Sequence, residues 1–254
     1  MSILDRFSLK DKVAIVTGSS AGLGQAMAVG FAQAGAAVVG VATRDSRETK
    51  EKIEAFGGRF HAVQADLSTL QPVPRVVEEA LRAFGRIDIL VNNAGIIRRQ
   101  DIIDFTEENW DDVVDLNLKT AFFLSQAVAR QFIAQGSGGK IINTASMLSF
   151  QGGIRVVSYT ASKSGLAGIT KAMACEWARF GINVNALAPG YMATDNTMQL
   201  RADPGRFQEI LGRIPAGRWG EADDMVGPAL FLASSASDYL NGAIVPVDGG
   251  YQAR

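Results

Sequence analysis

The sequence predicts an α/β protein with a parallel sheet of seven strands and helices on both faces. Two features carry this prediction: seven short apolar runs rich in β-branched residues recur along the chain, and segments with helical spacing lie between them. Strands that alternate with helices form parallel sheets through right-handed crossovers. Apolar runs without polar alternation are typical of strands covered on both faces, so a doubly wound sheet is expected.

The expected strands follow the apolar runs in chain order. They cover residues 13–16, 37–42, 61–65, 89–92, 140–144, 182–188 and 243–247. The expected helices cover residues 22–35, 72–85, 108–136 and 158–180. Residues 192–218 are the most polar and least strand-like segment, which predicts a flap over a site. With neither a repeat nor a low-complexity linker, residues 1–254 are expected to form one domain.

Composition and charge exclude several classes of protein. Hydrophobic residues make up 47% of the 254 residues and charged residues 20%, which indicates an ordinary globular core. The formal net charge is -1 and no run of five like charges occurs, so neither nucleic acid nor membrane is expected as a partner. Charges break every apolar run in the first twelve residues, which predicts a cytoplasmic protein without a signal peptide.

The chain contains one cysteine, Cys175, and one histidine, His61. One residue of each type does not supply the ligands of a usual zinc site, so no metal centre is expected. A single cysteine forms no internal disulfide, and a buried filler is the expected role of Cys175.

A glycine-rich loop follows the first expected strand. Gly18, Gly22 and Gly24 lie in the stretch TGSSAGLG with the spacing G-x-x-x-G-x-G, directly before an expected helix. Glycines allow the backbone to turn tightly and to approach a pyrophosphate at the helix N-terminus. Although the spacing differs from G-x-G-x-x-G, its place in the first βα unit predicts a dinucleotide site on a Rossmann fold.

A tyrosine and a lysine are spaced by one helical turn in the stretch SYTASKSGL. Tyr159 stands four residues before Lys163, so in a helix both side chains lie on one face. The ammonium then favours the phenolate over the phenol, which predicts an acid/base tyrosine. Taken alone, the pair is also compatible with a chance helical spacing.

These motifs and their order resemble the short-chain dehydrogenases/reductases. The matching stretches are TGSSAGLG at 17, ADL at 65, NNAG at 92, LNL at 116, Ser146, Tyr159 with Lys163, and PG at 189 followed by Thr194. They extend over nearly the whole chain. The resemblance implies an NAD(P)-dependent alcohol dehydrogenase or carbonyl reductase.

The resemblance also implies which residues surround the cofactor. The glycine loop would hold the pyrophosphate, and Asp66 with Leu67 would meet the adenine. Asn92 and Gly95 would flank the adenosine ribose, while Thr194 would contact the nicotinamide amide. The implied cofactor-binding set is Gly18, Ser20, Gly22, Leu23, Gly24, Thr43, Arg44, Asp66, Leu67, Asn93, Ala94, Gly95, Tyr159, Lys163, Pro189, Gly190 and Thr194.

The choice between NAD and NADP depends on the residues after the second strand. A carboxylate there normally holds the ribose 2′-hydroxyl and excludes a 2′-phosphate. Here the position is Ala42, followed by Thr43 and Arg44, which is suited to neutralising a phosphate. Ala21, however, stands where phosphate-preferring relatives often carry a basic residue. NAD is the expected cofactor, and NADP is the alternative.

The resemblance implies a catalytic tetrad of Asn117, Ser146, Tyr159 and Lys163. Hydride leaves a secondary alcohol only if its proton also leaves, and a tyrosine of pKa about 10 is a poor base at neutral pH. Lys163 and the positive ring of oxidised nicotinamide would lower that pKa. Ser146 would hydrogen-bond the substrate oxygen, and Asn117 would hold a water that connects Lys163 to solvent.

The expected substrate pocket carries guanidinium groups, which suit an acidic or polyhydroxylated substrate. Each arginine is equally compatible with a surface or subunit-contact role. The surrounding stretches resemble the sugar-acid branch of the family, which implies a keto sugar acid of the 2-dehydro-3-deoxy-D-gluconate or 2-deoxy-D-gluconate type. The implied substrate residues are Arg99, Ser146, Leu148, Gln151, Arg155 and Tyr159, with Arg99 or Arg155 as the carboxylate anchor and Arg213 and Arg218 in reserve.

Two other functions share parts of this pattern. A fatty-acid 3-oxoacyl reductase has the same scaffold and motifs, but usually prefers NADPH and a basic surface for its acyl carrier. A nucleotide-sensing regulator without catalysis would be expected to have lost the tetrad. The complete tetrad therefore favours an enzyme.

A homotetramer is expected from two long apolar segments, residues 107–135 and 158–180. Their apolar side chains exceed what one sheet face can cover, and the resemblance implies that such helices pair across a two-fold axis. The alternative is that they are simply core. The residues concerned are Phe122, Phe123, Val128, Phe132, Leu166, Ile169, Met173 and Trp177.

Overall fold

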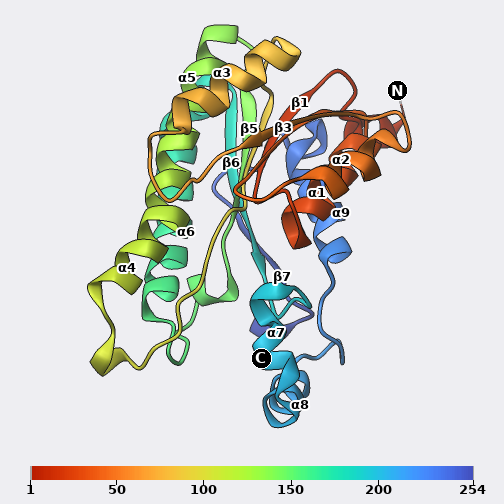
Figure 1. The fold of residues 1–254 in the computed structure, drawn as a ribbon. Coiled ribbons are helices and arrows are strands. Elements are labelled where there is room, and N and C mark those ends of the chain that lie inside the picture. The colour runs from red at the N-terminus through yellow and green to blue at the C-terminus, as the bar shows by residue number, and fades with distance from the viewer. Residues whose placement is uncertain (1, 254) are drawn as a thin grey trace.

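The computed structural model describes residues 2–253, which are built around one seven-stranded sheet (Figure 1). All neighbouring strands pair in parallel, in the order β3-β2-β1-β4-β5-β6-β7. The predicted parallel, doubly wound sheet is confirmed, and the strand order reverses between β1 and β4. The strands are β1 (Val13–Thr17), β2 (Ala37–Ala42), β3 (Arg59–Gln64), β4 (Ile89–Asn92), β5 (Gly139–Thr144), β6 (Ile182–Pro189) and β7 (Ile244–Val247).

Helices cover both faces of the sheet. In Figure 1, α3, α5 and α6 lie on one side of it, and α1, α2 and α9 lie on the other. Helices α7 and α8 fall within the predicted flap, residues 192–218. The helices are α1 (Gly22–Gln33), α2 (Arg47–Glu54), α3 (Val73–Phe84), α4 (Glu107–Val114), α5 (Ala121–Gln135), α6 (Val157–Trp177), α7 (Met198–Ala202), α8 (Pro204–Arg213) and α9 (Val226–Ala233).

The two-fold alternation of side chains along each strand explains how both faces are filled. Along β1, Val13 and Ile15 enter the core beneath α3, α5 and α6, whereas Ala14 and Val16 enter the core beneath α1 and α9. All four side chains are at most 3% exposed. Burial on both faces is the reason that the strands read as continuous apolar runs rather than as alternating patterns.

The long helix expected over residues 108–136 is interrupted by one π-helical segment. Residues Asp115–Thr120 adopt π-helical hydrogen bonding between α4 and α5, while the flanking residues keep right-handed helical angles. π-Bulges of this kind are often found at functional sites. Here the bulge carries Asn117, a residue of the predicted tetrad.

Outside the flap, helices α2 and α9 were not predicted because they lack the expected apolar spacing. Helix α2 has the sequence RETKEKIE and buries only Thr49 and Ile53. Helix α9 has the sequence VGPALFLA, which is apolar on all sides and therefore shows little periodicity. Their packing against α1 determines the helical state in both cases.

The expectation that Cys175 is buried is wrong, because its side chain is exposed. Its neighbour Ala174 occupies the face of α6 that packs on the sheet, which turns Cys175 outward. His61 lies in β3 and its Nε2 is 2.9 Å from Glu79 Oε2. Among residues 2–253, no group of three or more potential ligands is placed to hold a metal ion.

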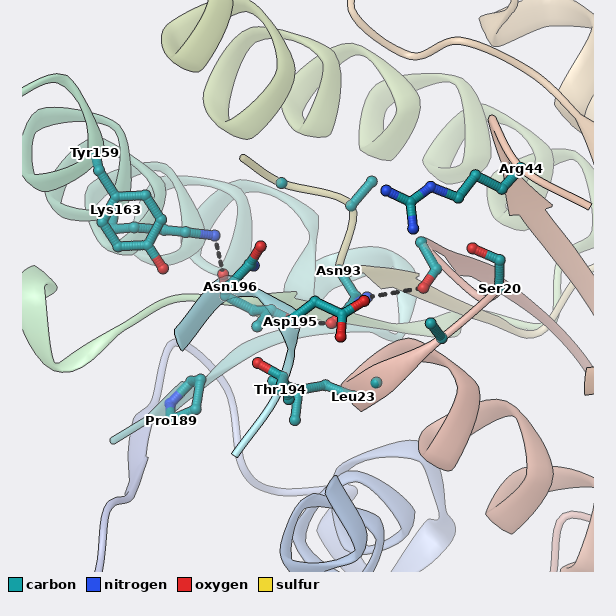
Figure 2. A pocket seen from close by; sticks show the side chains of 16 residues that line it. Ser20, Leu23, Arg44, Asn93, Tyr159, Lys163, Pro189, Thr194, Asp195 and Asn196 are labelled. Atoms are coloured by element: carbon teal, nitrogen blue, oxygen red, sulfur yellow. Dashed lines mark hydrogen bonds between the residues drawn. The ribbon is translucent and has the colours of Figure 1, made fainter. Parts of the chain in front are cut away.

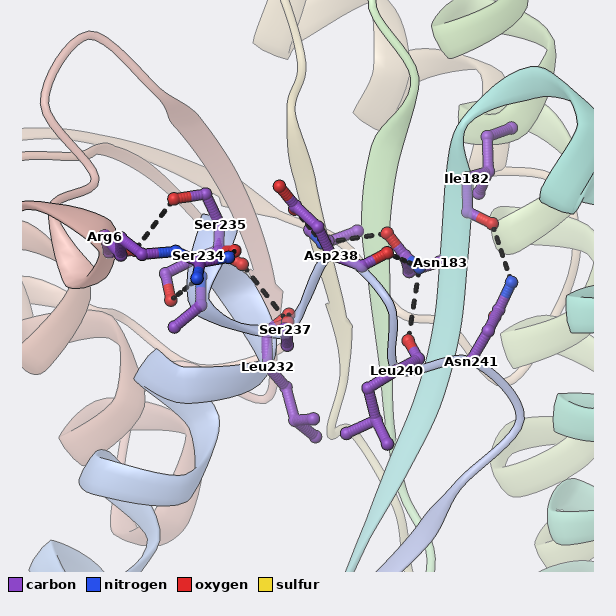
Figure 3. Close-up of polar contacts among 12 residues, drawn as sticks. Arg6, Ile182, Asn183, Leu232, Ser234, Ser235, Ser237, Asp238, Leu240 and Asn241 are labelled. Atoms are coloured by element: carbon purple, nitrogen blue, oxygen red, sulfur yellow. Dashed lines mark hydrogen bonds and ion pairs between the residues drawn. The ribbon is translucent and has the colours of Figure 1, made fainter. Parts of the chain in front are cut away.

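Hydrogen bonds join the turn after α9 to β6 and to the N-terminal segment, at the amino ends of the strands (Figure 3). Asn183, near the start of β6, donates to the carbonyl oxygens of Asp238 and Leu240 at 3.1 and 3.2 Å. Arg6 donates to the carbonyl oxygen of Ser235 at 2.9 Å, which ties the N-terminal segment to the turn after α9. This end of the sheet is therefore closed by its own side chains, and the opposite end remains for ligands.

None of the helices formed by residues 2–253 combines the length and the apolar character that crossing a membrane requires.

Candidate active site

A cleft of about 270 Å³ opens at the carboxyl ends of β1, β4, β5 and β6 (Figure 2). In doubly wound sheets, ligands bind at this edge, where the strand order reverses. Figure 2 shows Tyr159 and Lys163 reaching in from α6, with Ser20 and Arg44 toward the other end. The lining residues are Gly18, Ser20, Ala21, Gly22, Leu23, Arg44, Asn93, Ala94, Gly95, Thr144, Tyr159, Lys163, Pro189, Thr194, Asp195 and Asn196.

The glycine loop is shaped for close approach by a ligand. Gly18 and Gly22 have φ angles of +66° and +56°, which favour glycine. A Cβ on Gly24 would lie 2.2 Å from the carbonyl oxygen of Gly18, so only glycine allows α1 to begin here. Ala21, the N-cap of α1, makes no side-chain capping bond, which leaves N–H groups at the helix start for an anion. These features fit a dinucleotide pyrophosphate.

Two adjacent asparagines after β4 have different environments. Asn93 lines the cleft, and its Nδ2 donates to the carbonyl oxygen of Thr17 at 3.0 Å, which holds the loops after β1 and β4 together. Asn92 was expected to flank the adenosine ribose, but its Nδ2 donates to Ser125 Oγ at 2.8 Å and to Asn143 Oδ1 at 2.9 Å. Its side chain is buried beneath the cleft, so its role is structural.

Several other residues of the implied cofactor set lie outside this lining. Gly24 packs behind the loop, as described above, and Gly190 lines the neighbouring cleft. Asp66 is exposed and its Oδ1 accepts a hydrogen bond from Ser68 N at 2.9 Å, while Leu67 is buried in the core. Thr43 is exposed next to Arg44. An adenine contact for Asp66 and Leu67 stays a prediction.

Tyr159 connects this cleft to a second, larger one. The Tyr159 side chain lines both clefts, and Ser146 lines the larger one. Burial raises the pKa of Tyr159, while a hydrogen bond with Ser146 and the positive charge of Arg99 act in the opposite direction. Burial is the largest of these effects on the Tyr159 pKa, and the lowering expected from Lys163 together with oxidised nicotinamide stays a prediction.

Lys163 is almost fully buried, with 3% of its surface exposed. Its Nζ donates to the carbonyl oxygen of Thr144 at 2.6 Å and lies 5.5 Å from the centroid of the Tyr159 ring. Burial lowers the pKa of the Lys163 ammonium to about 8. One donor is engaged by Thr144, and an ammonium carries three, so further donors remain for a ligand in the cleft.

Both the oxygen and the nitrogen of the Asn117 side-chain amide form hydrogen bonds. Its Oδ1 accepts from Ile96 N at 2.9 Å, and its Nδ2 donates to Ile96 O at 2.9 Å and to Ser162 Oγ at 3.3 Å. These bonds fix the loop after β4 against α6, next to Lys163. The Asn117 side chain thus joins the loop after β4 to α6, and the predicted role of Asn117 in holding a water stays a prediction.

The second cleft has a volume of about 510 Å³, within the range of small-molecule pockets. Of the predicted substrate residues, Arg99, Ser146, Leu148, Gln151 and Tyr159 line it. The others come from the loop after β4, the segment between β5 and α6, the end of β6, the flap and the C-terminal turn: Ile97, Met147, Gly152, Gly153, Ile154, Val156, Gly190, Tyr191, Asn196, Thr197, Leu200, Arg206, Glu209, Arg213 and Tyr251.

The structure does not bring Arg155 into the cleft. Its Nε lies 3.0 Å from Asp101 Oδ1, with both side chains more than half exposed. Arg218 was a further candidate anchor from the sequence. It donates two hydrogen bonds of 2.7 Å to the Asp224 carboxylate at the base of the flap. Neither arginine lines the second cleft, and Arg99 and Arg213 are the two candidate anchors that do.

One protein-family model matches most of the chain. Residues 12–205 match the family model described as short chain dehydrogenase. The chain belongs to the short-chain dehydrogenase family. It is therefore an oxidoreductase that uses a nicotinamide cofactor, as the sequence resemblance implied.

Curated and solved relatives cover essentially the whole chain. A 2-dehydro-3-deoxy-D-gluconate 5-dehydrogenase of Dickeya dadantii is 63% identical over 252 residues, which are 99% of this chain and 100% of the relative. A proposed 2-deoxy-D-gluconate 3-dehydrogenase of Agrobacterium tumefaciens, solved with NADP, is 53% identical with a TM-score of 0.91, covering 98% and 100%. A gluconate 5-dehydrogenase of Burkholderia cenocepacia, solved with NADP and tartrate, is 39% identical with a TM-score of 0.94, covering 100% of both.

Proposed function

We propose that this short-chain dehydrogenase interconverts a diketo sugar acid and its hydroxy-keto partner, the latter of the 2-dehydro-3-deoxy-D-gluconate type. The observation that carries the proposal is that Tyr159 lines both the dinucleotide cleft and a second cleft that contains three arginines and one glutamate, a net charge of +2. A cationic pocket next to a hydride donor suits a carboxylate-bearing ketone. The relatives named for sugar acids support the same substrate class.

In this proposal Tyr159 is the general acid/base residue. When bound, the nicotinamide supplies or accepts the hydride. Ser146 hydrogen-bonds the reacting oxygen. The Tyr159 phenol gives a proton to that oxygen during reduction, and the Tyr159 phenolate takes the proton during oxidation. The positive charge of Arg99 favours the phenolate and offsets part of the burial effect. Lys163 holds the cofactor ribose through the ammonium donors that Thr144 leaves available.

We infer that the cofactor pocket accepts NADP, although NAD was expected from the sequence. No hydrogen bond or ion pair joins the Arg44 side chain to another residue in the 2–253 range, and it lines the cleft beside Ser20 (Figure 2). With Ala42 in place of the usual carboxylate, nothing repels a 2′-phosphate at this position. The NADP in the two solved relatives supports the same choice.

Arg44→Ala is expected to raise the KM for NADPH about 10- to 100-fold, because a charge-assisted hydrogen bond to the 2′-phosphate is lost. The KM for NADH is expected to stay within a few-fold of wild type. Arg47→Ala is the matched control, since Arg47 is exposed and pairs with Asp45 outside the cleft. Equal losses for both cofactors, or none, would argue against a phosphate contact.

The main alternative is an NADPH-dependent 3-oxoacyl reductase. The lining of the second cleft mixes apolar side chains with three arginines, and these cations favour an acid over an uncharged acyl chain. The discriminating experiment follows nicotinamide absorbance with purified protein, a panel of keto sugar acids and a panel of 3-oxoacyl thioesters. The proposal requires the higher kcat/KM for a sugar acid, and a preference for the thioesters contradicts it.

We propose a homotetramer, with pairing through the outer faces of α5 and α6. Of the apolar residues expected there, Val128, Phe132, Leu166 and Met173 are core. Phe122, Ile169 and Trp177 are only partly buried and line a surface groove of about 310 Å³ between the two helices. Light scattering at micromolar concentration is expected to give a tetramer, and a monomer would contradict this proposal.

A further inference from the structure

We propose that Arg213, held against Tyr251, is the residue that binds the substrate carboxylate and so determines specificity for an acid. This inference rests on the proposed function and names the anchor within the same cleft. Arg99 or Arg155 was expected in that role from the sequence. The contacts of each arginine near the cleft favour Arg213 instead.

Two of the three arginines in the second cleft have other partners. Arg206 Nη1 forms an ion pair and hydrogen bond with Glu209 Oε2, which neutralises its charge. Arg99 Nη2 donates to the carbonyl oxygen of Asn196 at 3.1 Å, and its charge acts on Tyr159 and Tyr191. Arg99 therefore lies at the reacting end of the cleft, where it influences the tyrosine rather than a distant carboxylate.

Arg213 is the cleft arginine whose donors remain available. Its guanidinium lies 4.6 Å from the centroid of the Tyr251 ring. No hydrogen bond or ion pair links its side chain to any other residue within the described part of the chain, 2–253. A guanidinium placed against an aromatic face keeps its in-plane N–H groups free for a bidentate bond to a carboxylate.

The aromatic side chains beneath Arg213 hold it in place. Tyr251 packs against Tyr191, with ring centroids 5.4 Å apart, and Tyr191 packs in turn against Trp219 at 5.4 Å. Tyr251 is 4% exposed and Trp219 is 7% exposed, so the platform is buried. Arg213 is itself exposed, but a guanidinium held against an aromatic ring needs less ordering when the substrate binds, and this favours Arg213 as the anchor.

The reacting groups and Arg213 share one cleft. Ser146, Tyr159 and Arg213 all line it. Arg213 lies against Tyr251, whose ring packs against Tyr191, another residue of the same lining. A carboxylate fixed at the far end selects which of several similar carbons faces the nicotinamide.

The test compares an acid with its neutral amide on wild type, Arg213→Ala, Arg213→Lys and the control Arg155→Ala. Arg155 is an exposed arginine paired with Asp101 outside the cleft. Two quantities are measured: kcat and KM for 2-dehydro-3-deoxy-D-gluconate and for its primary amide, and calorimetric binding of the acid to enzyme saturated with NADH or NADPH, where no reaction occurs. Melting temperatures verify that each variant is folded.

We expect Arg213→Ala to raise the KM and the dissociation constant of the acid about 10- to 100-fold, with kcat within a few-fold of wild type and the amide unaffected. Arg213→Lys is expected to recover part of the loss, because the charge is retained without the bidentate geometry. Acid binding by Arg213→Ala equal to wild type overturns the anchor, as does an equal loss for acid and amide. Binding that depends on Arg213 without turnover would retain the anchor and reject the proposed reaction.

Discussion

Replacing Tyr159 with phenylalanine is expected to lower kcat about 100- to 10,000-fold while cofactor affinity stays near wild type. The ring of Tyr159 lines both clefts, so phenylalanine fills the same volume and preserves the packing beside the nicotinamide site. What disappears is the hydroxyl that bonds Ser146 and carries the transferred proton. Steady-state kinetics and fluorescence titration with the reduced cofactor measure the two effects separately.

Tyr239→Phe is the matched control for this prediction. Tyr239 is fully exposed and lies in the turn after α9, at the end of the sheet opposite the clefts. Its loss of a hydroxyl should leave kcat and KM unchanged. If Tyr159→Phe retains more than a few per cent of wild-type turnover, Tyr159 is not the acid/base group.

Lys163→Ala is expected to reduce both the rate and the affinity for the cofactor. The Lys163 ammonium is buried within 2.6 Å of the Thr144 carbonyl oxygen, and its remaining donors point to a ligand in the cleft. Their loss should raise the cofactor dissociation constant about 10- to 100-fold. Loss of the positive charge near the Tyr159 ring also disfavours the phenolate, so kcat should fall about 100-fold or more.

The control for Lys163 is another lysine of the same helix. Lys171→Ala removes an exposed ammonium two turns further along α6 and should change neither quantity. Cofactor affinity that is unchanged in Lys163→Ala would exclude the ribose contact. An unchanged kcat at saturating cofactor would exclude the electrostatic effect on Tyr159.

The strands and the joint placement of Tyr159 and Lys163 could be predicted from the sequence because each depends on local pattern. Burial on both faces makes the strands read as apolar runs, and the glycine loop follows β1 directly. Helix α6 carries Tyr159 and Lys163 one turn apart, so their joint appearance at one cleft follows from helical spacing alone. The local succession of strand, loop and helix is therefore sufficient to predict the sheet, the glycine loop and the Tyr159–Lys163 pair.

Other features depend on tertiary structure and have no local signature. Helix α9 and strand β7 both lie between Arg213 and Tyr251 in the sequence, and only folding places the guanidinium over the ring. Asn92 and Asn93 are indistinguishable in sequence, yet adjacent positions at a strand end face opposite directions, toward the core and toward the cleft. The pKa of Tyr159 is likewise set by burial, which charge spacing does not reveal.

Transfer of deuterium from the cofactor tests the central claim most directly. Purified enzyme is incubated with the diketo form of the sugar acid and with NADPH or NADH that carries deuterium on the transferred position of the nicotinamide. The account predicts that mass spectrometry finds one deuterium on the carbon of the new hydroxyl for each cofactor oxidised, and that Tyr159→Phe yields almost none. Cofactor oxidation without label in the sugar acid, or no reaction with any keto sugar acid, would contradict it.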